Sequence, residues 1–192
     1  MIGNSAYKTS QLRNPANDAR AMAKALCESG FNVVERIHVS RREMGRVLRE
    51  FGNLIARDKG TGLFYFAGHG MQIKGRNFLI PVGADIERED EVAYAAIDAG
   101  EILGKMESAK NAMDIVILDA CCNNPFARSF RSSSQGLAQM DAPNGSLVAY
   151  ATSPGSTAND GDGANGMWRP CWSFSPCRAC GWRMCSRRSA SR

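Results

Sequence analysis

Two short segments of the chain are apolar at almost every position, and we expect both to be buried β-strands. Residues 63–67 read LFYFA, and residues 114–119 carry the run IVIL between two aspartates. Continuous apolar runs of this length are typical of strands whose two faces are both covered by helices. Less pronounced apolar or alternating segments predict further strands, or ends of strands, at residues 1–3, 31–39, 78–81 and 146–152.

Between these strands the apolar residues recur with the period of a helix. One helix is predicted over residues 15–29, because Pro15 suits the first helical position and Gly30 suits the C-terminal cap. Ser40 and Asp98 are expected to cap two further helices through their side-chain oxygens. Strands and helices that alternate in this way predict an α/β fold, with a mostly parallel sheet of about five strands between two layers of helices.

The composition agrees with one folded domain and excludes a membrane protein. The chain has 192 residues, of which 44% are hydrophobic and 22% are charged, as in ordinary globular proteins. It holds no apolar run near the roughly 18 residues that a membrane-spanning helix needs. The first residues (MIGNS) have neither the basic flank nor the apolar stretch of a secretory signal. We therefore expect a cytoplasmic protein.

The net charge of +5 comes from the C-terminal tail, residues 167–192, which contains six arginines and no acidic residue. The remaining chain is nearly neutral, so it offers no basic face for nucleic acid. The tail also holds all three tryptophans and shows no helical or strand period. Three interpretations stay open for it: a shifted reading frame, a disordered basic tail, or a zinc site built from its four cysteines, whose spacing fits no standard finger.

Two reactive residues follow the two apolar strands. His69 comes directly after the first strand and Cys121 after the second, about 50 residues further along the chain. The carboxyl ends of parallel strands lie at one edge of a sheet, so these two side chains are able to meet. A thiol is a nucleophile as its thiolate, which a neighbouring imidazole stabilises. The backbone amides of Gly70 and Cys121 are the candidate donors for the oxyanion.

The motifs around these residues resemble those of the caspase-like cysteine peptidases, and most of all the bacterial metacaspase-type members. The segments that carry the resemblance are IGNSAY at residues 2–7, YFAGHG at 65–70, FLIP at 78–81, LDAC at 118–121, NNPF at 123–126 and ATSPG at 151–155. The resemblance covers residues 1–166, which we interpret as the catalytic domain. It implies a three-layer αβα sandwich of the caspase-hemoglobinase kind, with the C-terminal part of the sheet incomplete where the tail replaces it.

The resemblance also implies a function for each matching residue. The protein would be a cysteine-type endopeptidase that acts on peptides or proteins, with Cys121 as the nucleophile and His69 as the general acid and base. Asp18 and Asp119 match the acidic pair that lines the S1 pocket of metacaspases and selects arginine or lysine at P1. A carboxylate pair binds a guanidinium far better than an acidic side chain. Cys122 is interpreted as a non-catalytic neighbour.

No cofactor is expected for this chemistry. Some metacaspases require calcium, and the acidic run at residues 85–91 is the candidate for binding it, although such runs are ordinarily solvated loops. Self-processing is also implied, with Arg128 or Arg131 as the candidate cleavage points. The alternative is a catalytically silent or truncated caspase-like module that acts in regulation or interaction, because the tail stands where relatives complete the substrate groove.

Overall fold

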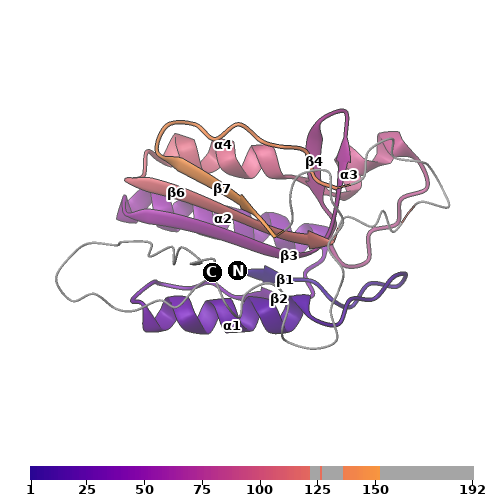
Figure 1. Cartoon of the computed structure of the whole chain (residues 1–192), viewed down its shortest axis with the longest axis horizontal. Helices are drawn as coiled ribbons and strands as arrows, with labels where there is room; N and C mark the ends of the chain where they lie inside the picture. Colours follow the sequence, from indigo (N-terminus) through magenta and orange to yellow (C-terminus); the bar gives the residue numbers. More distant parts are fainter. Residues whose placement is uncertain (122–125, 127–135, 152–192) are drawn as a thin grey trace, which may run out of the picture.

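A long central strand, β3 (Thr61–Ile73), organises the sheet (Figure 1). The computed structural model describes residues 1–121, 126 and 136–151. In it, β3 pairs in parallel with β1 (Ile2–Gly3) on one side and with β6 (Met113–Cys121) on the other. The parallel part continues to β2 (Arg36–Ile37) beyond β1 and to β7 (Ser146–Tyr150) beyond β6. These five parallel strands confirm the prediction of a mostly parallel sheet.

The last part of β3 leaves the parallel sheet and forms an antiparallel extension. Its residues 70–73 pair with β4 (Arg76–Leu79), and β4 pairs in turn with β5 (Ile97–Asp98). The described sheet therefore has seven strands, two more than expected. The segment at residues 78–81 was predicted as a weak strand without a direction, and the turn at residues 74–75 makes it antiparallel.

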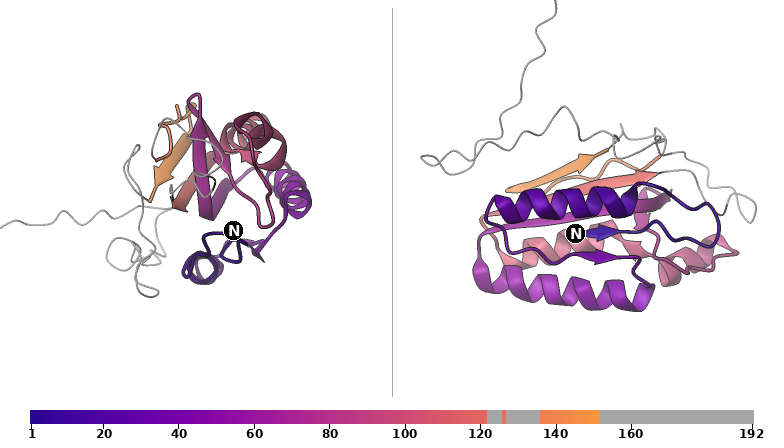
Figure 2. Two further views of the ribbon diagram at one scale, coloured as in Figure 1. Left: turned by 90° about the vertical axis from the view of Figure 1, so that its right-hand side faces the viewer. Right: turned by 90° about the horizontal axis from the view of Figure 1, so that it is seen from below.

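Helices cover both faces of the sheet (Figure 2). The helix α1 (Pro15–Glu28) packs on one face, where Met22 and Leu26 contact the sheet, while α2 (Arg41–Asp58) and α4 (Ala99–Ala109) pack on the other. This arrangement confirms the predicted three-layer αβα sandwich. None of the helices in the described part of the chain combines the length and the apolarity that crossing a bilayer demands.

The strand β3 sends alternate side chains into two separate cores, as the pleat of a strand requires. Phe64 and Phe66 lie in the core beneath α2 and α4, whereas Tyr65 and Ala67 lie in the core beneath α1. All four are at most 3% exposed. The continuous apolar run at residues 63–67 is thus explained, because both faces of the strand are buried.

The strand predicted at residues 31–39 is much shorter in the structure. Only Arg36–Ile37 pairs as β2, because its partner β1 has two residues and therefore offers few backbone groups to bind. The adjoining backbone still contributes, since the His38 amide donates to the Gly3 carbonyl. Alternation in the sequence reports which side chains are buried, but a strand also needs a neighbour of matching length.

The acidic segment at residues 85–91, expected to be a loop, ends in one short helical turn, and a second turn follows it directly. They are the 3₁₀ turn η1 (Glu89–Glu91) and the single-turn helix α3 (Val92–Ala95). Val92 is buried beside Ile80 and Ile86 in a third apolar cluster, which lies against the antiparallel extension. A turn this short has no repeated apolar spacing, so its sequence does not predict it.

Several sequence-based interpretations fall on residues outside the described ranges. These are the interpretation of Cys122, the self-processing points at Arg128 and Arg131, the C-terminal limit of the catalytic domain at residue 166, and all three interpretations of the tail at residues 167–192. They stay predictions from the sequence.

Ser40 caps α2 as predicted, and the contact supports a stability prediction. The Ser40 hydroxyl accepts a hydrogen bond from the Glu43 amide, and the Glu43 carboxylate accepts one from the Ser40 amide at 2.9 Å. Ser40→Ala is expected to lower the free energy of unfolding by about 1 kcal/mol, measured by urea denaturation at neutral pH. Ser108→Ala, an exposed serine inside α4, is the matched control and is expected to change stability by less than ~0.5 kcal/mol. Equal losses of stability in Ser40→Ala and Ser108→Ala would contradict the cap.

The cap also predicts a pH dependence. Hydrogen bonds from the Ser40 side chain and then from its backbone hold the pKa of Glu43 below its ordinary value. A carboxyl with a lowered pKa in the folded state stabilises the fold above its ordinary pKa and loses this contribution as the pH falls. The loss in free energy of unfolding caused by Ser40→Ala should therefore be smaller in acid than at neutral pH.

Candidate active site

His69 and Cys121 are direct neighbours in the sheet. The parallel pairing of β3 and β6 runs over nine residue pairs, and the last of them joins His69 to Cys121. Paired strands lie about 4.8 Å apart, so the two backbones are adjacent at the carboxyl end of the parallel sheet. His69 does not follow the strand, as the sequence suggested, but lies within β3, which continues into the antiparallel extension. The expected meeting of the two positions is nevertheless what the register shows.

The His69 ring is buried, and one of its nitrogens is held by the backbone. His69 is 1% exposed, and its Nε2 lies 2.6 Å from the carbonyl oxygen of Ser10. A carbonyl can only accept, so Nε2 carries the proton of the neutral ring and Nδ1 is the basic nitrogen. Ser10 lies in the segment between β1 and α1 and has a left-handed backbone conformation, with φ of 58°. This geometry suits a histidine that exchanges a proton through Nδ1.

Gly70 pairs with Leu79 where β3 turns into the antiparallel extension. A Cβ at this position would lie 2.9 Å from the Cβ of Ala120 and 3.2 Å from Leu137. The absence of a side chain is therefore required by close packing between β3 and β6. The structure places Gly70 one residue beyond the pair of His69 and Cys121, and the oxyanion role of the Gly70 and Cys121 amides stays a prediction.

Asp119 and Asp18 lie on the same side of the sheet. Asp119 pairs in register with Ala67 and is two residues beyond Ile117, whose side chain packs beneath α1, so Asp119 shares that face. The Tyr65 hydroxyl donates to its Oδ2 at 3.1 Å. Asp18 is half-buried in the first turn of α1, the turn that packs on β1. The two carboxylates are thus on the α1 side, at the end of the sheet that holds His69.

The acidic run at residues 85–91, the candidate for binding calcium, makes contacts within its own turn. The Glu91 carboxylate accepts hydrogen bonds from the Glu87 and Arg88 amides, and Asp90 forms an ion pair with Arg88 at 3.0 Å. Within the described residues, no three side chains of His, Cys, Asp or Glu gather closely enough to hold a metal ion. Glu91 and Asp90 thus stabilise the turn that they belong to, and calcium binding stays a prediction from the sequence.

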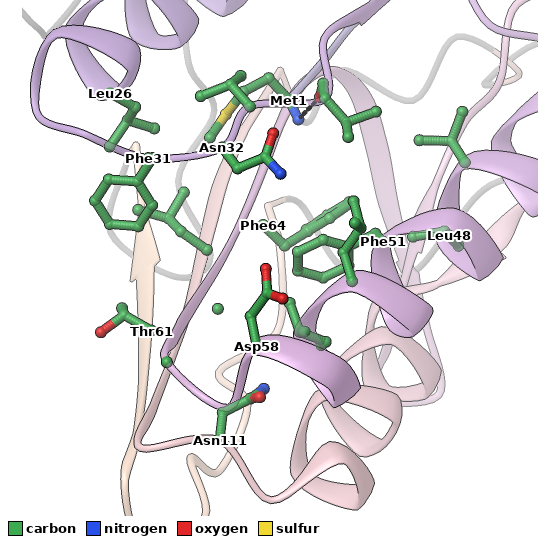
Figure 3. Close-up of a pocket in the computed structure, with 18 of the residues that line it drawn as sticks. Met1, Leu26, Phe31, Asn32, Leu48, Phe51, Asp58, Thr61, Phe64 and Asn111 are labelled. Carbon is green, nitrogen blue, oxygen red and sulfur yellow. Dashed lines mark hydrogen bonds between the residues drawn. The ribbon is translucent and has the colours of Figure 1, made fainter.

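A cavity of about 130 Å³ lies at the opposite end of β3 (Figure 3). Residues 61–64 of β3 line it, and even Phe64, the nearest of them, is about 16 Å along the strand from His69. Phe51, Phe64, Leu26 and Phe31 give it a mainly apolar wall. The residues that line it include neither a cysteine nor a histidine, and it is separate from the candidate active site.

Sequence reasoning assigned no role to two residues that contact His69 directly. Ser10 acts through its backbone carbonyl, so its side-chain type carries no signal. Tyr7 packs its ring against the His69 ring, with centroids 4.4 Å apart, and its hydroxyl accepts a hydrogen bond from the His69 amide at 3.0 Å. Tyr7 lies in the segment IGNSAY that carried part of the family resemblance, and that was the signal from which it could have been found.

The chain matches known proteins in both sequence and structure. A family model described as the caspase domain matches residues 1–169. Over 123 residues the chain is 31% identical to mucosa-associated lymphoid tissue lymphoma translocation protein 1 of Homo sapiens and to the homolog of Mus musculus, matches that cover 63% of this chain and 14% of those proteins. The crystal structure of the Drosophila initiator caspase Dronc is similar with a TM-score of 0.55 and 13% identity, over 80% of this chain and 54% of that chain. The structural likeness confirms the caspase-hemoglobinase fold.

Proposed function

Because the chain belongs to the caspase domain family of cysteine peptidases, we propose that it is an endopeptidase that hydrolyses peptide bonds through a thioester on Cys121. The observation that carries this proposal is the register of β3 and β6, which pairs His69 with Cys121 at the end of the parallel sheet. A nucleophile and its base must lie within reach of each other, and adjacent strands provide that distance without a mobile loop.

The hydrogen bond to Ser10 supports a separate role for each ring nitrogen of His69. With Nε2 protonated and held by the Ser10 carbonyl, Nδ1 takes the proton of the Cys121 thiol. The thiolate attacks the scissile carbonyl, and the Gly70 and Cys121 amides donate to the oxyanion. The His69 imidazolium then gives its proton to the leaving amine as the carbon–nitrogen bond breaks. A water molecule, deprotonated by His69, finally hydrolyses the thioester and regenerates the thiol.

Asp18 and Asp119 make basic residues the proposed substrates at P1. Asp119 and the first turn of α1 are on the same face of the sheet, at the end that holds His69. The Tyr65 hydroxyl donates to one carboxylate oxygen of Asp119, which orients this carboxylate. An arginine at P1 would form charge-assisted hydrogen bonds with the pair, whereas an aspartate would be repelled. This is the specificity that the likeness to metacaspases also implies.

The test is hydrolysis of fluorogenic peptides by the purified chain. Peptides identical except for arginine, lysine or aspartate at P1 would be compared, with calcium and with a chelator. We expect cleavage after arginine and lysine, little after aspartate, and equal rates in both buffers, since the thiolate and imidazole supply the nucleophile and the acid. Folded protein that cleaves none of the peptides would support the alternative of a silent module, and faster cleavage after aspartate would contradict the S1 assignment.

A further inference from the structure

The side chain of Tyr7 joins three parts of the structure at His69. Tyr7 lies in the segment between β1 and α1 and is 5% exposed. Its hydroxyl accepts a hydrogen bond from the His69 amide at 3.0 Å and donates one to the carbonyl of Ile80 at 2.9 Å. A single buried oxygen thus binds the backbone of the candidate base and the residue that follows β4.

This hydroxyl replaces a regular hydrogen bond of the sheet. The Ile80 amide donates to the His69 carbonyl at 3.0 Å. In an antiparallel ladder, residues that make such a bond ordinarily exchange a second one from the other amide. Here the His69 amide reaches the Ile80 carbonyl through the Tyr7 hydroxyl instead. At His69, one direct backbone hydrogen bond between the two strands is therefore replaced by a pair of hydrogen bonds through the Tyr7 hydroxyl.

Neighbouring residues leave room for this arrangement. Gly68 has a φ of 157°, and a Cβ added there would lie 2.6 Å from the Tyr7 hydroxyl oxygen. Any other residue at this position would collide with the hydroxyl, so the glycine before His69 and the tyrosine form one packing unit. On the ring side, the Tyr7 and His69 rings are tilted by 55° with centroids 4.4 Å apart. The imidazole is thus held by Tyr7 at its ring and backbone and by Ser10 at Nε2.

We propose that Tyr7 is a positioning residue that fixes the backbone and ring of His69 for proton exchange with Cys121. This inference rests on the proposed function. The hydroxyl sets the place of the His69 backbone relative to β4, and the ring blocks other rotamers of the imidazole. An aromatic ring within about 6 Å of a cation also stabilises it, which favours the imidazolium of the thiolate–imidazolium pair.

The test separates the hydroxyl from the ring. Tyr7→Phe keeps the ring and is expected to lower kcat about tenfold, because a buried amide loses its acceptor. Tyr7→Leu removes both and is expected to lower kcat about 100-fold, as misplacement of a catalytic group does. KM should change less than about twofold in both, since Tyr7 acts on the chemical step. The matched control is Tyr150→Phe, which removes a hydroxyl that likewise accepts from a backbone amide, that of Met140, far from His69 in the chain. It should keep kcat within about twofold.

A second measurement keeps the proposal testable if no peptide is cleaved. The rate at which iodoacetamide alkylates Cys121 at neutral pH reports its thiolate, which depends on a well-placed His69, and fragment masses distinguish Cys121 from Cys122. We expect about tenfold slower alkylation in Tyr7→Phe than in the wild type, while Tyr150→Phe equals the wild type. Equal alkylation and equal kcat in Tyr7→Phe would overturn the proposal, as would an equal loss in Tyr150→Phe. Absent hydrolysis by the wild type would refute only the proposed function.

Discussion

Replacing Cys121 with alanine is expected to lower kcat for an arginine peptide by about 10⁴-fold or more, the loss seen when a nucleophile is removed from a catalytic unit. The physical reason is that alanine offers no thiolate to form the covalent intermediate. The chain supplies a closely matched control in Cys122→Ala, which removes the adjacent thiol and is expected to retain the wild-type rate. Steady-state hydrolysis of a fluorogenic peptide measures both variants.

His69→Ala should cause a loss of similar size, and the double variant should be little worse than either single one. Residues that act as one unit show this non-additivity, because each needs the other for the same step. The register that pairs His69 with Cys121 supports this expectation. Hydrolysis that survives Cys121→Ala, or a loss shared by Cys122→Ala, would contradict the assignment of the nucleophile.

The second large effect is expected at the S1 pocket. Asp119→Asn keeps the size of the side chain and an acceptor for the Tyr65 hydroxyl, but removes the charge. We expect kcat/KM for an arginine peptide to fall by about 10²–10³-fold, because a desolvated guanidinium loses its charged partner. A peptide with glutamine at P1 should be cleaved at nearly the same rate by both proteins. Comparing kcat/KM for the two peptides separates specificity from general damage.

Two controls complete this comparison. Asp85→Asn changes the net charge by the same amount at an exposed position away from the sheet, and it should leave both peptides unaffected. Asp18→Asn should resemble Asp119→Asn, because we assign both carboxylates to one pocket. An Asp119→Asn protein that cleaves the arginine and glutamine peptides with unchanged preference would remove Asp119 from the pocket.

The parts of the fold that the sequence predicted are those with a local signal. The apolar run at residues 63–67 and the capping residues Ser40 and Asp98 behave as expected, since Asp98 also accepts a hydrogen bond from the Gly100 amide. The misjudged parts depend on which strands pair, and for how many residues. The strand at residues 31–39 is short because β1 is short, and β3 extends beyond its apolar run because β4 pairs with it.

The same distinction explains the candidate site. His69 and Cys121 were predictable because their side-chain chemistry and their places close after apolar runs are both visible in the sequence. Ser10 was not, because its contribution is a carbonyl placed by a left-handed backbone conformation. Tyr7 had only the signal of the segment IGNSAY, because its hydroxyl bridges His69 and Ile80 across 62 and 73 residues of chain and no local pattern reports such contacts. Contacts of this kind arise only when the loop after β1 folds back over the sheet.

The most direct test of the central claim is covalent capture of the nucleophile. The full chain would be treated with a peptidyl acyloxymethyl ketone ending in arginine and with the same compound ending in aspartate, and the modified residue located by peptide mass mapping. We predict one adduct per chain, on Cys121 and on none of the other six cysteines, formed much faster with the arginine compound and slowed strongly by His69→Ala. An adduct on another cysteine would contradict Cys121 as the nucleophile of the proposed peptidase, and equal labelling by the two compounds would contradict the S1 assignment.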